Sequence, residues 1–204
     1  MDFKDIRFET LRQLNRTALH GQIVLAGSSL CEGFPINEML INRGIGAVVY
    51  NRGISGDTIA GYSARFDDCV LAIEPKKLFI NIGTNDLNGP EPDIPALIAG
   101  YEKLLKHAME KLPDMKVYVL SYYPINEKKH YSMPYHSQRT NKCIRLANDA
   151  LREMASRLGL PYIDVNAGLL NAEGELREEL TFDGMHMYSS GYEPVLDVLL
   201  PYFG

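Results

Sequence analysis

Five short apolar segments recur along the chain, and small or polar residues follow each of them. Segments of this length that are rich in aliphatic and aromatic residues are typical of buried strands. They cover residues 23–27, 46–50, 78–82, 117–120 and 162–165. This recurrence constrains the fold strongly, because buried strands need connections that cover the faces of their sheet.

The segments between these strands repeat apolar residues at helical spacing. Ser190 and Glu193 form a capping-box pattern that predicts the start of the last helix. Residues 122–136 show no period and are predicted to form a long loop, which in a compact domain is often a binding loop or lid. The predicted helices cover residues 3–19, 59–73, 97–112, 137–158 and 190–199, with a short one around 36–41.

Strands that alternate with helices predict parallel βαβ units and a sheet covered on both faces. We therefore expect an α/β protein with three layers, α/β/α, around a doubly wound sheet of five parallel strands. The 204 residues suffice for one domain with a substantial core, and neither an internal repeat nor a linker interrupts them. A single domain over residues 1–204 is the expected organisation.

Charge and composition narrow the classes of partner. The net charge is −5 and no basic run occurs, which argues against nucleic acid as a partner. No segment approaches the roughly 20 apolar residues of a spanning helix, and residues 1–5 do not resemble a signal peptide. Cys31, Cys69 and Cys143 are widely spaced and odd in number, which favours reduced thiols. We expect a cytoplasmic protein without membrane insertion.

Small and polar residues follow each of the first three predicted strands. Ser28 and Ser29 follow the first strand, Gly56 lies in the turn after the second, and Asn85 follows the third. The carboxyl ends of parallel strands meet at one edge of a sheet, so these residues are expected to converge. A fourth polar segment, residues 183–186, precedes the last predicted helix.

These residue types fit acyl transfer on a serine. A serine hydroxyl needs a base to take its proton, and a neutral imidazole suits that task. The imidazole needs an acceptor on its other nitrogen, and His186 is the only histidine with an aspartate, Asp183, three residues earlier in a turn with glycine. The backbone N–H groups of Ser29 and Gly56 and the side-chain amide of Asn85 are candidate oxyanion donors.

With these residues the sequence resembles the SGNH or GDSL hydrolases. Four segments match the family's blocks in order and over most of the chain: Gly27–Leu30, Ser55–Thr58, Gly83–Asp86 and Asp183–His186. The resemblance places the nucleophile at Ser29, the second-block glycine at Gly56 and the third-block asparagine at Asn85. It places the triad acid and base at Asp183 and His186.

The resemblance implies a flavodoxin-like sheet, hydrolysis of esters or thioesters, and no metal; we expect no cofactor. One position departs from the family, because Ser28 stands where its name-giving motif has an aspartate. That departure leaves the subfamily, and with it the substrate, open. We favour short acyl groups on a polar or sugar-like alcohol, while a lipid ester and a thioester stay open.

Several residues compete for these roles. Ser28 is the rival nucleophile, and Cys31 is expected to be a buried, inert thiol. Asp57 and Asp86 are expected to make local structural hydrogen bonds, and His130 and His136 to be solvated. The tyrosines of the long loop either line a substrate pocket or pack the loop on the core; they are Tyr122, Tyr123, Tyr131 and Tyr135.

The functional prediction is a serine esterase that acts on a small-molecule ester. The alternative is a non-catalytic module that binds a small ligand on the same fold, which would be expected to lack one of Ser29, Asp183 and His186. A nucleotide-binding protein would need a phosphate cradle after the first strand, and residues 27–29 are too short for one. The sequence does not indicate an oligomeric state.

Overall fold

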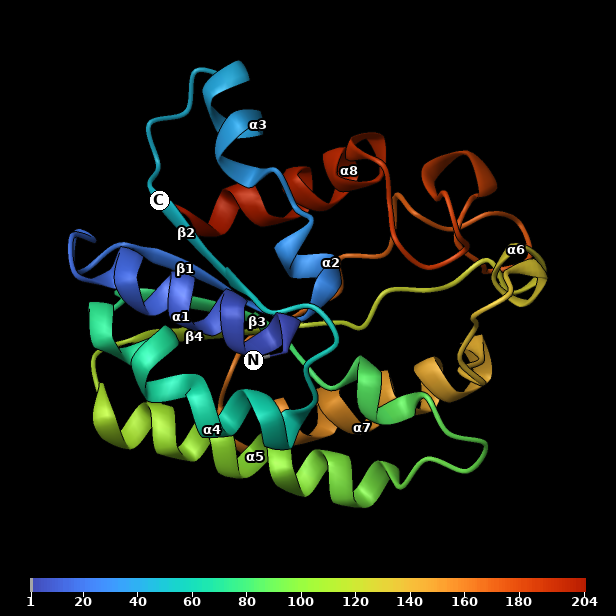
Figure 1. Ribbon diagram of the computed structural model, residues 1–204, viewed down its shortest axis with the longest axis horizontal. Coiled ribbons are helices and arrows are strands. Elements are labelled where there is room, and N and C mark those ends of the chain that lie inside the picture. The colour runs from blue at the N-terminus through green and yellow to red at the C-terminus, as the bar shows by residue number, and fades with distance from the viewer. Residues whose placement is uncertain (1) are drawn as a thin grey trace.

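The computed structural model describes residues 2–204, and a parallel sheet of five strands lies at its centre (Figure 1). The strands lie in the order β2-β1-β3-β4-β5, and every neighbouring pair is parallel. Their bounds are β1 Ile23–Gly27, β2 Val49–Gly53, β3 Lys77–Asn81, β4 Lys116–Leu120 and β5 Tyr162–Ile163. The strand order reverses between β1 and β3, so the prediction of a doubly wound α/β sheet is confirmed.

Helices cover both faces of this sheet and give three layers (Figure 1). Val24 and Ala26 of β1 pack in a core with α1, α4, α5 and α7, whereas Ile23 and Leu25 pack in a second core with α2, α3 and α8. The alternation follows from the two-residue period of a strand. The α-helices are α1 Phe3–Asn15, α2 Ser29–Glu32, α3 Ile36–Asn42, α4 Ile59–Cys69, α5 Ile94–Lys111, α6 Glu127–Ser132, α7 Asn141–Arg157 and α8 Ser189–Leu199. The 3-10 helices are η1 Leu71–Ile73, η2 Thr84–Leu87, η3 Glu178–Leu180 and η4 Leu200–Tyr202.

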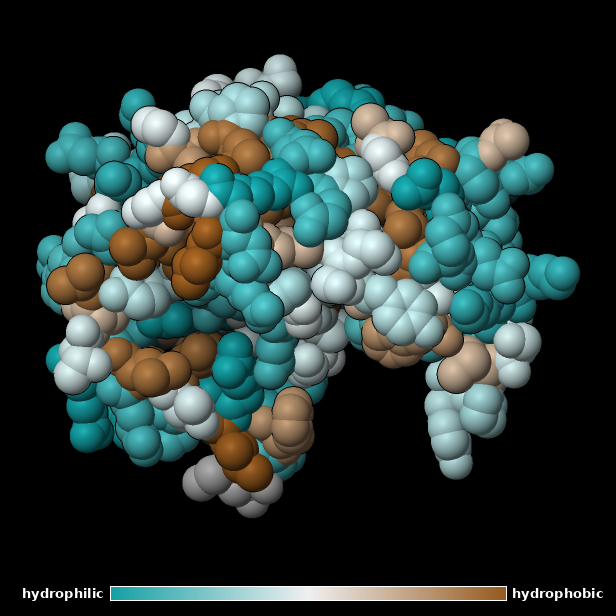
Figure 2. Space-filling view, turned by 90° about the horizontal axis from the view of Figure 1, so that it is seen from above, coloured by the Kyte–Doolittle hydropathy of each residue, from teal (hydrophilic) through white to brown (hydrophobic). Residues whose placement is uncertain are grey.

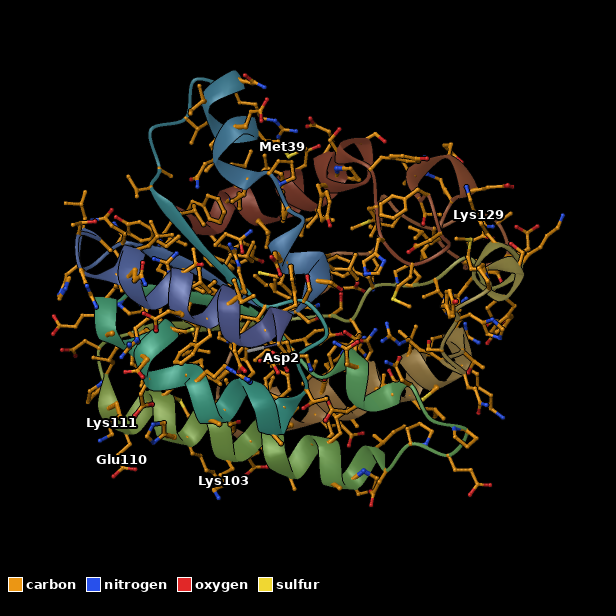
Figure 3. The ribbon with its side chains drawn as sticks, viewed as in Figure 1. Asp2, Met39, Lys103, Glu110, Lys111 and Lys129 are labelled. Atoms are coloured by element: carbon orange, nitrogen blue, oxygen red, sulfur yellow. The ribbon has the colours of Figure 1, made fainter. Side chains whose placement is uncertain are left out.

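Helix α5 exposes charged residues on one face and buries apolar residues on the other. Lys103, Glu110 and Lys111 of α5 point away from the body of the molecule, while the opposite face of α5 is buried in the core (Figure 3). On the face seen in Figure 2, hydrophobic residues lie in separate patches among hydrophilic ones. In the part of the chain from residue 2 onward, no helix is both long and apolar enough to cross a membrane.

The second strand lies three residues later than the sequence pattern predicts. β2 pairs with β1 in the register Ile23↔Val49 to Gly27↔Gly53, which places two polar residues, Asn51 and Arg52, inside an edge strand. The side-chain amide of Asn51 donates to backbone carbonyls in α2 and just after it. The guanidinium of Arg52 donates to the side chain of Asn15. In the sequence, two polar residues in a row indicate the end of a strand. Here the hydrogen bonds of Asn51 and Arg52 satisfy their polar groups, so both residues lie inside the strand.

Three local predictions in the second half of the chain are wrong. The predicted loop over residues 122–136 contains helix α6, capped by the side chain of Asn126. The next helix begins at Asn141 and not at residue 137, since Thr140 is its cap. Helix α8 begins at Ser189 with Tyr188 at its cap, so Ser190 does not cap it. Directly before α8, the backbone N–H of Tyr188 donates to the carbonyl of Leu180. This hydrogen bond fixes the start of α8 independently of any side-chain cap.

Truncation of Leu151 in α7 should lower stability strongly. Its side chain is fully buried in the core, so Leu151→Ala should cost about 2–5 kcal/mol in the free energy of unfolding. Leu146 on the same helix is 53% exposed, and Leu146→Ala serves as the matched control with an expected change below about 0.5 kcal/mol. Urea titrations of both variants measure the difference; equal losses would contradict this packing.

Candidate active site

Ser29 lies at the carboxyl end of β1, in the middle region of the sheet. It is the first residue of α2, directly after Gly27 and Ser28. Its Oγ lies 2.9 Å from Nε2 of His186, although the two residues are 157 positions apart. Nδ1 of His186 lies 2.6 Å from Oδ2 of Asp183. The structure therefore aligns a hydroxyl, an imidazole and a carboxylate in one hydrogen-bonded chain.

The turn from Asp183 to His186 is built around one carboxylate. Oδ1 of Asp183 accepts the backbone N–H of Met185 at 2.9 Å and that of His186 at 2.7 Å, while Oδ2 faces the imidazole. Gly184 inside the turn has φ +87°, and a Cβ on it would lie 2.3 Å from the backbone nitrogen of His130. Both the conformation and the close approach require glycine at this position.

Asp183 is held in its ionised form. Burial raises its pKa, but the hydrogen bonds from the imidazole of His186 and from two backbone N–H groups outweigh burial and bring the pKa to about 2. Because an ionised carboxylate only accepts hydrogen bonds, Nδ1 of His186 carries the hydrogen between them. Nε2 is then left as the acceptor that faces the hydroxyl of Ser29.

The candidate oxyanion donors follow β1, β2 and β3. One hydrogen of the Asn85 amide bonds to the backbone carbonyl of Asp57 at 2.8 Å, which leaves its second hydrogen free. Gly56, next to Asp57, has φ +73°. Within residues 2–204, the backbone N–H groups of Ser29 and Gly56 donate to no protein acceptor. The structure thus links Gly56 to Asn85 through Asp57 and leaves three N–H groups unpaired after three adjacent strands.

Two carboxylates hold the loop that follows β2 through hydrogen bonds and ion pairs. Oε2 of Glu32 accepts the backbone N–H of Ser55 at 2.7 Å and its hydroxyl at 2.6 Å. The buried carboxylate of Asp57 lies 3.3 Å from Arg65 and 3.9 Å from Lys4. Burial raises the pKa of Asp57, and these two cations lower it in part. Asp57 therefore has the structural role expected from the sequence.

The other rival residues are not part of the hydrogen-bonded chain of Ser29, His186 and Asp183. Oδ2 of Asp86 accepts the backbone N–H of Ile59 at 3.0 Å, so it too is structural. Ser28 is buried beside Ser29, and the hydrogen bond to His186 comes from Ser29. Cys31 is buried as expected, and burial raises the pKa of its thiol.

The prediction that His130 is solvated is wrong, although His136 is exposed. His130 is 3% exposed, because α6 packs against the turn at Gly184, and its Nε2 lies 3.1 Å from Oγ of Ser137. Burial lowers the pKa of His130.

Tyr122 and Tyr123 are buried in the two cores. These two tyrosines therefore pack the segment onto the cores and do not line a pocket.

Two residues near the triad escaped the sequence analysis. The ring of Phe182 stacks on the imidazole of His186 with centroids 5.9 Å apart, and Phe182 is 49% exposed. Its position directly before Asp183 was an available signal. The guanidinium of Arg139 contacts Asn85 and Met185, but no periodicity or motif marks residue 139.

Over residues 2–204, no cluster of three or more His, Cys, Asp or Glu side chains has the arrangement of a metal site.

Comparisons with known proteins identify a family model and solved structures that this chain resembles. The model of the GDSL-like lipase/acylhydrolase family matches residues 28–193. A structure from Streptococcus pneumonia, provisionally described as a platelet activating factor, has a TM-score of 0.89 at 26% identity, covering 99% of this chain and 93% of that one. No curated protein matches the sequence.

Two further structures share the fold at lower identity. A GDSL-like lipase from Bacteroides thetaiotaomicron has a TM-score of 0.80 at 19% identity, covering 99% of this chain and 98% of that one. An acetyl xylan esterase, AlAXEase, has a TM-score of 0.72 at 22% identity, covering 89% of this chain and 98% of that one. These likenesses extend over nearly all of the three-layer fold.

The depressed pKa of Asp183 should make stability depend on pH. The carboxyl titrates at about 2 in the folded protein against an ordinary value of 3.8, so the folded state favours the ionised form. The resulting stabilisation is complete above the ordinary value and is lost as the pH falls toward 2. Urea titrations from about pH 6 to about pH 2 should show a steeper loss for the parent than for Asp183→Asn. Parallel curves would contradict the assignment.

Proposed function

Since the chain belongs to the GDSL-like lipase/acylhydrolase family and is an ester hydrolase, we propose that it cleaves carboxylic esters through an acyl-enzyme on Ser29. In this proposal Asp183 and His186 complete the triad. The observation that carries it is the continuous hydrogen-bonded chain from Ser29 Oγ through His186 to Asp183, with distances of 2.9 and 2.6 Å. A binding module would not require this alignment.

Acylation begins when the hydroxyl of Ser29 attacks the ester carbonyl carbon and Nε2 of His186 takes its proton. The imidazolium that forms is stabilised by the ionised carboxylate of Asp183. The tetrahedral intermediate collapses when the bond to the alcohol oxygen breaks. His186 gives its proton to that oxygen, and the alcohol leaves the acyl group on Ser29.

Deacylation repeats these steps with water. His186 takes a proton from a water molecule, which attacks the acyl carbonyl carbon. The bond to Ser29 Oγ then breaks, His186 returns the proton to Ser29, and the carboxylic acid leaves. In both halves of the reaction the negative oxygen is proposed to accept the N–H groups of Ser29 and Gly56 and the free hydrogen of Asn85.

The substrate is proposed to carry a short acyl group on a polar or sugar-like alcohol. Phe182 supports this choice, because its half-exposed ring lies parallel to the imidazole of His186 and offers a flat apolar face beside it. Aromatic faces of this kind pack well against the apolar faces of small rings. The similarity to an acetyl xylan esterase is in keeping with an acetylated carbohydrate.

The proposed site combines residues from position 29 to position 186. We therefore propose that the chain forms one domain.

Ser29→Ala should abolish hydrolysis, whereas Ser28→Ala should leave most of it. A panel of p-nitrophenyl esters from acetate to decanoate provides the assay, and acetate should be the best substrate. The loss for Ser29→Ala should be on the order of 10⁴-fold or more in kcat, because triad residues act as a unit. Substantial turnover by Ser29→Ala together with loss in Ser28→Ala would move the nucleophile by one residue. No cleavage of any ester by the parent would favour the binding module.

A further inference from the structure

Arg139 is a buried cation without a carboxylate partner in the described chain. Its side chain is 2% exposed, and no Asp or Glu of residues 2–204 lies within 4 Å of its guanidinium. Burial lowers its pKa to about 10, so the guanidinium is still charged at neutral pH. An unpaired buried charge costs stability. Its presence therefore calls for a function that the fold alone does not supply.

The guanidinium lies between the two loops that form the candidate active site. Nη2 donates to Oδ1 of Asn88 at 2.7 Å and to Oδ1 of Asn85 at 3.4 Å, both in the turn after β3. Nη1 lies 3.4 Å from Sδ of Met185, in the turn that carries Asp183 and His186. One side chain thus touches both the proposed oxyanion loop and the triad loop.

These contacts determine which way the Asn85 amide points. A guanidinium has only donors, so the amide must turn its oxygen toward Arg139. On the other side, the backbone carbonyl of Asp57 has only acceptors and takes one hydrogen of the amide nitrogen at 2.8 Å. The amide is held from both sides in one orientation. A flipped amide would place donors against Arg139 and acceptors against Asp57.

The backbone around Arg139 is itself anchored to both loops. The N–H of Gln138 donates to the carbonyl of Asn88 at 3.2 Å, and the hydroxyl of Tyr131 donates to the carbonyl of Arg139 at 2.7 Å. At the other end of this segment, the N–H of Asn126 donates to the carbonyl of Gly184 at 2.7 Å. Lys129, labelled in Figure 3, donates to the carbonyl of Thr181 at 2.8 Å. Residues 126–139 therefore brace the site.

We propose that Arg139 is a positioning residue that orients the Asn85 amide as an oxyanion donor and fixes the oxyanion loop against the triad loop. The inference rests on the proposed function. Arg139 acts through Asn85, because its own side chain is too buried to touch a substrate. Its positive charge also lies behind the oxygen of Asn85, which polarises the amide toward stronger donation.

Kinetics of Arg139→Met on p-nitrophenyl acetate test this role. The loss should be about 10-fold to 100-fold and should fall on kcat, because a misplaced donor weakens the transition state more than substrate binding. Arg139→Lys should retain more kcat than Arg139→Met, since it keeps the charge and a donor. Arg145→Met, on the exposed face of α7, is the matched control and should match the parent.

A double-mutant cycle separates positioning from general damage. Asn85→Ala should lower kcat by about 10²–10³-fold, and adding Arg139→Met should cost less than about threefold more. The melting temperature of Arg139→Met should equal or exceed that of the parent, because a buried charge is removed. An unchanged kcat, a full additional loss in the Asn85→Ala background, or a kcat loss that parallels a lower melting temperature would overturn the inference.

A readout without substrate distinguishes this inference from the proposed function. The side-chain amide signals of Asn85 in a ¹⁵N spectrum are assigned by their absence in Asn85→Ala. Arg139→Met should shift or broaden these signals, while Arg145→Met should leave them in place. If the parent cleaves no ester but the signals move, the proposed function fails and the positioning role stands. If esterase activity is present and the signals do not move, the positioning role fails alone.

Discussion

The carboxylate of Asp183 is the group on which the rest of the site depends. One of its oxygens organises the turn through two backbone N–H groups, and the other holds the imidazole of His186. Because those hydrogen bonds keep its pKa at about 2, the carboxylate stays ionised and selects the imidazole tautomer that faces Ser29. The proposed proton transfers follow from this one arrangement, which needs glycine at position 184 to form.

The sheet brings distant loops together, but buried polar contacts set their final geometry. The ends of β1, β2 and β3 place Ser29, Gly56 and Asn85 at one edge. Side-chain contacts then fix the loops, with Glu32 bonded to the loop after β2. Arg139 lies between the loop after β3 and the turn that carries Asp183 and His186. Preorganised donors stabilise developing charge without reorganisation during the reaction, which is the role that we propose for the N–H groups held by these contacts.

The sequence predicts the parts of this protein that local pattern determines. Apolar runs identify the five strands of the sheet, and Ser29 follows the first of them. The polar segment before the last helix supplies Asp183 and His186, which complete the hydrogen-bonded set. The rest depends on tertiary contacts. The polar residues of β2 look like a strand end because their partners lie on other elements. Helix α6 shows no period because it has six residues, of which only His130 is buried. Arg139 carries no signal at all, since its partners lie 46 and 54 positions away.

We propose that Ser29 becomes a covalent acyl carrier activated by His186. Labelling with a fluorophosphonate, followed by peptide mass spectrometry, tests this claim directly because the reagent traps an activated serine. We expect one adduct, located on Ser29 by fragmentation, and its loss in His186→Ala. An adduct on Ser28, or labelling of Ser29 that persists at the same rate in His186→Ala, would contradict the proposed activation of Ser29 by His186.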